Sequence, residues 1–176
     1  KFGIFFKTSD AEEFLKKCNY PIVIKADGLA AGKGVYISEN QTAAIQAVKE
    51  IFEGKFGNSD QLLIEEFLNG EEMSFFVISD GNNFKQFGTA QDHKRVLEGD
   101  KGKNTGGMGA YSPSRLENQN LNDKIINKII KPTLKGLKEK NTNFKGFLYA
   151  GLMIINNEPY LIEYNVRMGD PECQTI

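Results

Sequence analysis

The sequence predicts an α+β fold. Strand-like apolar runs and helix-like amphipathic runs are mixed along the 176 residues, without the strict alternation of a doubly wound parallel sheet. Two pairs of strand-like runs are joined by turn sequences, Asp80-Gly-Asn-Asn83 and Asn156-Asn-Glu-Pro159, which indicates hairpins. Hydrophobic residues make up 40% of the chain and charged residues of both signs 26%, as in globular proteins. A chain of this length can bury a core in one or two compact lobes.

The first part of the chain is expected to hold two helices and three strands. Ser9-x-x-Glu12 resembles a capping box ahead of apolar residues at helical spacing, which predicts a short helix near 9–18. Ser38-x-x-Gln41 is a second candidate capping box, and Gly54 is a natural stop for the helix that follows it. Strands are expected over residues 21–26, 35–37 and 62–67.

The rest of the chain is expected to hold four strands and one long helix. The helix covers residues 121–137, and Pro132 should kink it or split it. Residues 92–114 read as a long loop, and loops of that length are usually functional or disordered. Strands are expected over residues 74–79, 84–90, 147–155 and 160–164.

Composition excludes several classes of function. The net charge of -1 provides no basic field for nucleic acid, and no apolar run approaches the length of a membrane span. The two cysteines are far apart and lack metal-binding spacing, which favours free thiols in a reducing compartment, here the cytoplasm. His93 is the only histidine, so a two-histidine metal site is excluded within this chain. Because the first residue is Lys1 and not Met, we expect a segment of a longer protein.

A glycine-rich loop over residues 27–34 is the most informative segment. Its glycines allow tight turns and close approach to a ligand, and two lysines at or near it supply positive charge for a polyphosphate. The spacing fits neither a Walker loop nor a Rossmann fingerprint, and a strand follows the loop where both motifs need a helix. An ordinary hairpin turn is the alternative, but the loop is longer than such a turn requires. The residues concerned are Lys25, Gly28, Gly32, Lys33 and Gly34.

A second signal lies in Glu163-Tyr-Asn165-Val-Arg167. On a strand, Glu163 and Asn165 point to the same face, and their carboxylate and amide oxygens suit Mg²⁺ with a nucleotide phosphate. Arg167 falls on that face if the strand continues, where it could bind a phosphate or a carboxylate in bidentate fashion. An edge strand with a polar outer face is the alternative.

Two further segments are more ambiguous. Residues 62–72 form an apolar strand that runs into four carboxylates, and they could present a flat apolar surface to a purine or simply end in a solvated turn. The loop holding Lys94, Arg95, Lys101 and Lys103 suits an anion-binding cover over a site. RNA binding is less favoured because Tyr111 is its single stacking aromatic residue. We interpret His93 as a structural residue.

Four sequence motifs, in the same order along the chain, resemble the ATP-grasp superfamily and, within it, the phosphoribosylamine–glycine ligase (glycinamide ribonucleotide synthetase) family. They are Ile24-Lys-Ala-Asp-Gly-Leu-Ala-Ala-Gly-Lys-Gly34, Gln91-Asp-His-Lys-Arg95, Asn104-Thr-Gly-Gly-Met-Gly-Ala-Tyr-Ser-Pro113 and Asn165-Val-Arg-Met-Gly-Asp-Pro-Glu172. The resemblance implies a small flap subdomain over residues 1–70. It also implies part of a larger antiparallel-sheet core over 71–176, with a metal-binding strand over 160–166.

The resemblance also implies roles for individual residues. ATP binding falls to Lys25, Gly28, Gly32, Lys33, Gly34, Glu65, Phe67, Leu68 and Glu72. Mg²⁺ or Mn²⁺ binding falls to Glu163 and Asn165, and Lys25 and Arg167 carry the catalytic roles. Binding of glycine and 5-phosphoribosylamine falls to Asp92, Lys94, Arg95, Gly106, Gly107, Met108, Arg167, Asp170 and Pro171.

The implied reaction belongs to de novo purine biosynthesis. ATP phosphorylates the carboxylate of glycine, and the amine of 5-phosphoribosylamine attacks the resulting glycyl phosphate, so no nucleophilic side chain is needed. Two features differ from what the resemblance would lead one to expect. Residues 149–153 lack the additional acidic metal ligand of many ATP-grasp enzymes, as the glycine ligases themselves do, and Lys103 stands where relatives typically have Pro.

The resemblance also bears on how much of the enzyme this chain represents. The family's enzymes have amino- and carboxy-terminal domains outside this segment, so we expect no activity from it alone. The alternatives are another ATP-grasp carboxylate–amine ligase or carboxylase of nucleotide metabolism, or a non-catalytic nucleotide-binding module.

Overall fold

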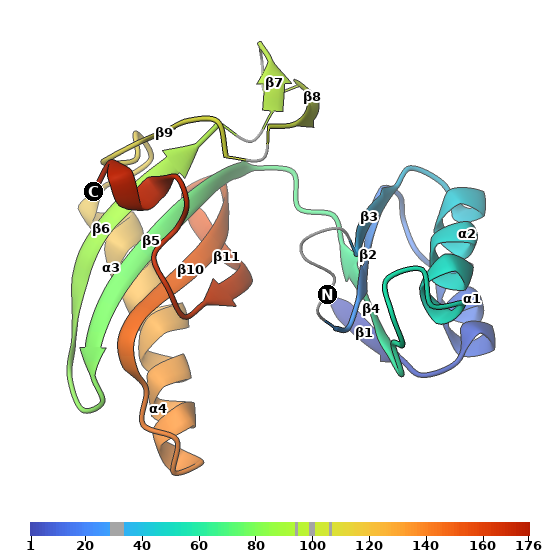
Figure 1. Ribbon diagram of the computed structural model, residues 1–176, viewed down its shortest axis with the longest axis horizontal. Coiled ribbons are helices and arrows are strands. Elements are labelled where there is room, and N and C mark those ends of the chain that lie inside the picture. The colour runs from blue at the N-terminus through green and yellow to red at the C-terminus, as the bar shows by residue number, and fades with distance from the viewer. Residues whose placement is uncertain (29–33, 94, 99–100, 106) are drawn as a thin grey trace. The chain divides into compact units, whose positions relative to one another are not determined.

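The computed structural model describes residues 1–28, 34–93, 95–98, 101–105 and 107–176 (Figure 1). The chain divides into two compact units, Lys1–Leu68 and Asn69–Ile176. Both units combine helices with antiparallel sheets, so the α+β prediction is confirmed. The unit boundary lies two residues before the one expected at residue 70.

The first unit is a four-stranded antiparallel sheet with two helices. Its strand order is β1-β4-β2-β3. The strands are β1 (Phe2–Phe5), β2 (Ile22–Ala26), β3 (Val35–Ser38) and β4 (Leu62–Glu66), and the helices are α1 (Thr8–Leu15) and α2 (Gln41–Phe52). The expected hairpin around the glycine-rich loop is present as β2 and β3. Strand β1 was not predicted, and it adds an edge strand beside β4.

Alternation along the strands gives this sheet two different faces. Ile22, Ile24, Leu62 and Ile64 are buried in one cluster with residues of α1 and α2. The intervening residues point to the opposite face, and Figure 1 shows both helices on the same side of the sheet. One face of the sheet therefore forms the core, and the other presents its side chains to solvent.

Neither predicted capping box forms. The N-cap of α1 is Lys7, which makes no side-chain cap, and the Ser9 hydroxyl donates instead to the Asp10 carboxylate. Asn40 caps α2, where its side-chain oxygen accepts from the Ala43 amide at 3.0 Å. Ser38 ends β3, so its backbone is committed to the sheet before the helix begins.

The second unit is built on a five-stranded antiparallel sheet of order β11-β10-β5-β6-β9. The strands are β5 (Glu71–Asp80), β6 (Phe84–Asp92), β9 (Ala110–Tyr111), β10 (Lys145–Ile155) and β11 (Glu158–Asn165). A two-stranded ribbon is formed by β7 (Arg95–Leu97) and β8 (Lys101–Asn104). The prediction of an irregular loop over 92–114 is therefore wrong in part, because three short strands lie within it.

The predicted long helix is present, but it is interrupted. It runs through α3 (Gln119–Ile125), a π-helical segment (Ile126–Ile130) and α4 (Lys131–Glu139). Pro132 lies in the first turn of α4, directly after the π-helical segment. Because Pro lacks an amide hydrogen, it cannot continue the regular ladder, and the wider turn before it accommodates this loss. A 3₁₀ helix, Glu172–Gln174, lies near the end of the chain.

The five-stranded sheet also has two different faces. On one face, Phe75, Val77, Ala150 and Leu152 pack with residues of α3 and the π-helical segment, including Ile125. On the other face, Phe76, Ala90 and Tyr149 form a smaller cluster with Met168. Figure 1 shows the C-terminal segment on the face opposite α3 and α4. The segment after β11 thus covers part of the face that the helices leave open.

Both predicted hairpin turns of the second unit are present. Asn156 and Asn157 have φ of 51° and 61°, the left-handed values required by a two-residue type I′ turn between β10 and β11. The Asp80 carboxylate accepts from the amides of Asn82 and Asn83 at 2.8 and 2.6 Å, which closes the turn between β5 and β6. Within the residues described, the helices are too short or too polar to cross a membrane.

The cap of α2 yields a stability prediction. Asn40→Ala leaves the Ala43 amide without its acceptor and should destabilise the chain by about 1 kcal/mol. Asn40→Ser should retain most of the stability because a serine oxygen can cap in the same way. Urea unfolding followed by circular dichroism measures both variants, and equal stability of Asn40→Ala and the parent would contradict the assigned cap.

Candidate functional site

The helix-free face of the first sheet carries an ion pair at its centre. The Lys25 Nζ and Glu65 Oε2 atoms are 2.5 Å apart, and the side chains are 22% and 28% exposed. Lys25 lies opposite Leu63, and Glu65 lies opposite Val23, so the two charges are diagonal neighbours on antiparallel strands. The pair fixes the position of the lysine ammonium, which an incoming anion could share or take over.

Apolar side chains surround this ion pair. Phe2 lies directly opposite Glu65, and Val35 lies directly opposite Lys25. Exposed apolar residues on this face are Phe2, Ile4, Val35 and Ile37. An exposed apolar patch of this kind marks a surface that binds a ligand or partner. A flat apolar surface with one fixed cation suits a planar base that carries phosphate groups.

The ends of the glycine-rich loop are anchored on both sides. The Ala26 amide donates to the Gly34 carbonyl at 2.8 Å, and the Ser59 hydroxyl donates to the Asp27 carbonyl at 2.9 Å. Gly28 has a φ of +151°, in the range that favours glycine. The predicted phosphate ligands Gly32 and Lys33 lie outside the described residues, so their roles stay predictions.

The residues predicted to line the adenine site are spread over the end of β4 and the start of β5. Glu65 is engaged with Lys25, and Phe67 and Leu68 follow β4 with Phe67 36% exposed. Glu72 belongs to the second unit and lies opposite Met153. Their contact with a nucleotide stays a prediction.

In the second unit, Glu163 and Asn165 lie side by side on β11. The Asn165 Nδ2 atom donates to Glu163 Oε1 at 3.0 Å, which shows that the two side chains point to the same face as predicted. Across the ladder they oppose Gly151 and Tyr149 on β10. An adjacent carboxylate and amide oxygen can serve a hard cation such as Mg²⁺.

Gly151 makes room for the Glu163 side chain. A Cβ atom built on Gly151 would lie 3.0 Å from Glu163 Cγ and 3.7 Å from the Glu163 carbonyl oxygen. From the sequence, the strand that holds Gly151 was noted only for its lack of an acidic metal ligand. The structure supplies a reason for glycine here, because a larger residue would displace the carboxylate.

Glu163 and Asn165 provide few ligands by themselves. The described residues contain no group of three or more His, Cys, Asp or Glu side chains arranged to hold a metal ion. Mg²⁺ takes six oxygen ligands and usually keeps several from water and substrate phosphates. The donor set therefore fits a cation that arrives with a nucleotide better than a permanently bound structural ion.

Arg167 does not lie on a continued strand. Strand β11 ends at Asn165, and Arg167 is exposed in the following segment, where its guanidinium donates to the Met168 carbonyl at 2.9 Å. The condition under which Arg167 would share the strand face, a strand that continues past Asn165, is therefore not met. Its side chain is held by a backbone acceptor in the turn, which still leaves most of its donors for a ligand.

The structure brings together two groups of predicted substrate residues. Gly107 has a φ of +90°, and a Cβ built on it would lie 3.2 Å from both the Asp170 carbonyl oxygen and Pro171 Cδ. The glycine-rich segment after β8 thus packs closely against the turn that precedes the 3₁₀ helix. This contact joins segments more than sixty positions apart in the sequence.

The remaining predicted substrate residues are spread along the chain between the end of β6 and the start of β9. Asp92 ends β6 opposite Ala110, and Met108 is 82% exposed. Arg95 begins β7, while Lys94 and Gly106 lie outside the described residues. The His93 amide donates to the Gly109 carbonyl at 2.8 Å, which helps to close this segment.

A buried polar cluster was missed by sequence reasoning. Ser74, Tyr149 and Glu172 lie within hydrogen-bonding distance of one another beneath the turn at Asp170 and Pro171. Ser74 is a polar residue inside the apolar run 73–78, which was the available signal. Its partners are far away in sequence, so the cluster could not be assembled from spacing alone.

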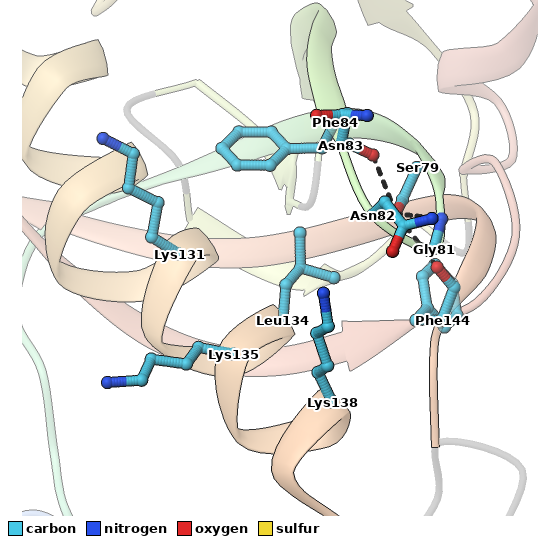
Figure 2. Close-up of a pocket in the computed structure, with 10 residues that line it drawn as sticks. All are labelled: Ser79, Gly81, Asn82, Asn83, Phe84, Lys131, Leu134, Lys135, Lys138 and Phe144. Atoms are coloured by element: carbon cyan, nitrogen blue, oxygen red, sulfur yellow. Dashed lines mark hydrogen bonds between the residues drawn. The ribbon is translucent and has the colours of Figure 1, made fainter. Parts of the chain in front are cut away.

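A cavity of about 240 Å³ lies on the face of the second sheet that the helices cover (Figure 2). Figure 2 shows the β5–β6 turn on one side of it and α4 on the other. Its lining includes three lysines, of which Lys131 donates to Asn127 and Lys135 pairs with Glu139. These contacts are typical of a solvated helix face, and none of the predicted site residues lines the cavity.

Comparisons with known proteins agree over nearly the whole chain. Residues 1–173 match the family model described as phosphoribosylglycinamide synthetase, ATP-grasp (A) domain. A phosphoribosylamine–glycine ligase of Mesorhizobium japonicum is 49% identical over 176 residues, which is 99% of this chain and 41% of that protein. A chloroplastic phosphoribosylamine–glycine ligase of Arabidopsis thaliana is 50% identical over 180 residues, 100% of this chain and 34% of that protein.

A solved structure extends this similarity to the fold. The crystal structure of phosphoribosylamine–glycine ligase from Thermotoga maritima matches with a TM-score of 0.89 at 38% identity, over 98% of this chain and 44% of that one. The ATP-grasp fold is thereby confirmed. The chain spans less than half the length of these relatives.

The close approach of Gly151 and Glu163 yields a prediction. Gly151→Ala should displace Glu163 and weaken Mn²⁺ binding about tenfold, the usual scale for disturbing a ligand's support. Gly136→Ala is the matched control, because a Cβ there meets nothing within 4 Å and helix α4 should gain about 0.5–1 kcal/mol. Titration of Mn²⁺ in the presence of ATP, followed by electron paramagnetic resonance, measures both, and unchanged affinity in Gly151→Ala would refute the proposed fit.

Proposed function

The chain belongs to the phosphoribosylglycinamide synthetase ATP-grasp (A) domain family, and from this we propose that it is the ATP-binding part of a phosphoribosylamine–glycine ligase. The longer enzyme joins glycine to 5-phosphoribosylamine and forms glycinamide ribonucleotide in de novo purine biosynthesis. The observation that carries the proposal is the family match over residues 1–173, together with relatives of that name at about half identity.

Nucleotide binding in the first unit rests on Lys25. Its ammonium is held at 2.5 Å from the Glu65 carboxylate within an exposed apolar face. A triphosphate carries enough negative charge to compete for the lysine, and charge-assisted hydrogen bonds of this kind are strong. We assign the phosphates to Lys25 and the glycine-rich loop, and the base to the apolar surface near Phe67 and Leu68.

Metal binding in the second unit rests on Glu163 and Asn165. Their oxygens fit Mg²⁺ or Mn²⁺, and when bound this cation neutralises charge on the transferring phosphoryl group. Asn165 Nδ2 donates to Glu163, which leaves the amide oxygen of Asn165 free to turn toward the same ligand. The two residues bind and orient, and neither needs to exchange a proton during the reaction.

The substrates follow from the chemistry that such a site can support. A carboxylate has no good leaving group, so a carboxylate oxygen of glycine first attacks the γ-phosphorus of ATP, and ADP leaves. The resulting glycyl phosphate loses phosphate when the amine of 5-phosphoribosylamine attacks its carbonyl carbon. Positioning and charge neutralisation supply most of the acceleration in such transfers. We assign orientation of the anionic groups to Arg167, Asp170 and the loop at Gly107.

Two further assignments are part of the proposal. The flanking domains of the longer enzyme complete the sites for glycine and 5-phosphoribosylamine, so the 176-residue chain binds nucleotide without turnover. We place the enzyme in the cytoplasm, which is supported by the free cysteines Cys18 and Cys173. The Arabidopsis relative is named as chloroplastic, so a plastid is the alternative compartment.

The phosphate role of Lys25 is tested by calorimetry. Lys25→Ala should weaken binding of Mg²⁺–ATP by 10- to 100-fold, the range expected for losing a hydrogen bond to a charged group. Lys49→Ala is the matched control, because Lys49 forms an ion pair with Glu12 on the helix side of the same unit. Equal affinity of Lys25→Ala and the control for Mg²⁺–ATP would remove Lys25 from the site.

The metal role of Glu163 is tested through the metal dependence of ATP binding. Glu163→Gln should abolish most of the gain in ATP affinity that Mg²⁺ provides, while affinity in excess chelator stays within about twofold. Glu158→Gln on the same strand is the control, because its carboxylate pairs with Lys124 and Lys128. A Mg²⁺ effect in Glu163→Gln as large as in the parent would exclude Glu163 as a ligand.

A further inference from the structure

A buried carboxylate lies directly after the predicted substrate turn and has no role in the proposal above. Glu172 is 2% exposed. Its Oε1 atom accepts from the Ser74 hydroxyl at 2.9 Å and lies 3.3 Å from the Tyr149 hydroxyl, while Ser74 and Tyr149 are 3.0 Å apart. A carboxylate is seldom buried without partners, because leaving it unpaired there is costly.

The turn is shaped around this carboxylate. A Cβ built on Gly169 would overlap the Glu172 carboxyl atoms, so glycine is needed for the side chain to fold back. The Cys173 amide donates to the Gly169 carbonyl at 2.9 Å and closes the turn. Gly169 and Glu172 therefore belong to one closed turn.

The partners of Glu172 lie in the same cross-strand rows as the candidate metal ligands. Ser74 opposes Gly151, which opposes Glu163. Tyr149 opposes Asn165 directly. Residues opposed in this way share a face of the sheet. The carboxylate thus connects the turn to the two rows of side chains that end in Glu163 and Asn165.

The turn at Asp170 and Pro171 also supports the glycine-rich segment after β8. Gly107 packs against the Asp170 carbonyl oxygen and Pro171 Cδ, as its built Cβ at 3.2 Å from each shows. A shift of the turn would therefore also move this segment. The turn that holds the buried Glu172 side chain thus contacts both groups of predicted substrate residues.

We propose that Glu172 is a positioning residue that, through Ser74 and Tyr149, holds the turn bearing Arg167 and Asp170 at a fixed place beside Glu163 and Asn165. This inference rests on the proposed function, because that function gives Arg167 its ligand. If the polar cluster only stabilised the core, removing it would lower the stability of the protein but would not affect ligand binding through Arg167.

The first test is hydrogen exchange in the full 176-residue chain. Glu172→Ala and the milder Ser74→Ala should speed exchange at least tenfold at the Cys173 and Gln174 amides, which donate to the Gly169 and Pro171 carbonyls and so close the turn. Glu172→Gln should stay within threefold of the parent, because its amide oxygen can accept from both hydroxyls. Glu117→Ala is the matched control, since Glu117 accepts from Gln86 and Asn122 on the helix-covered face.

The second test is a double-mutant cycle on the affinity for Mg²⁺–ATP. If Glu172 acts through Arg167, Arg167→Ala combined with Glu172→Ala should bind no more weakly than Arg167→Ala alone. Glu117→Ala should instead combine additively with Arg167→Ala. If the effects of the Arg167 and Glu172 variants on Mg²⁺–ATP affinity are coupled, while those of the Arg167 and Glu117 variants are not, Glu172 acts by positioning Arg167.

Three results would overturn the inference. They are unchanged exchange at the Cys173 and Gln174 amides in Glu172→Ala, an equal increase there in Glu117→Ala, or additive effects of the 167 and 172 variants. Failure of the proposed function is distinguishable, because the parent would then fail to bind Mg²⁺–ATP. If the parent does not bind Mg²⁺–ATP, or if Arg167→Ala binds it as tightly as the parent, the double-mutant cycle gives no answer. The hydrogen-exchange measurement then decides by itself whether Glu172 holds the turn.

Discussion

Cross-strand alternation in antiparallel sheets is the constraint on which this structure depends. In each unit, every second residue of a strand is committed to a core with helices, and this leaves the residues between them on the other face. Lys25 and Glu65 meet there because they are diagonal neighbours in the first sheet. Glu163 and Asn165 meet there because they lie two apart on one strand of the second sheet. A slip of one residue would bury all four polar groups.

The same constraint explains why glycine and buried polar groups occur beside the predicted site. Gly151 opposes Glu163, so the carboxylate side chain occupies space that any other residue would fill. Glu172 is buried against the neighbouring strands and fastens the C-terminal turn to them. The side chains proposed to bind ligands are thus supported by residues that need not touch a ligand themselves. Such support is what fixes a site closely enough for phosphoryl transfer.

Sequence reasoning succeeded where a local pattern determines the outcome. The two-residue spacing of Glu163 and Asn165 predicted their shared face, and turn sequences predicted the hairpins around Gly81 and Asn156. It failed where the outcome depends on distant contacts. Helix α2 is capped by Asn40 and not by Ser38, because pairing with Ile22 holds Ser38 in the sheet. The burial of Glu172 depends on Ser74, which is 98 positions away, and no local spacing carries that information.

We propose above that the nucleotide binds the helix-free face of the first sheet, around Lys25. The most direct measurement is methyl-detected nuclear magnetic resonance of the 176-residue chain during titration with a non-hydrolysable Mg²⁺–ATP analogue. The account predicts large shifts for Val23, Val35 and Leu63, which share the face of Lys25, and small shifts for Ile24 and Ile64, which face the helices. Shifts confined to Leu134 and the cavity of Figure 2, or to the helix-facing methyl groups, would contradict it.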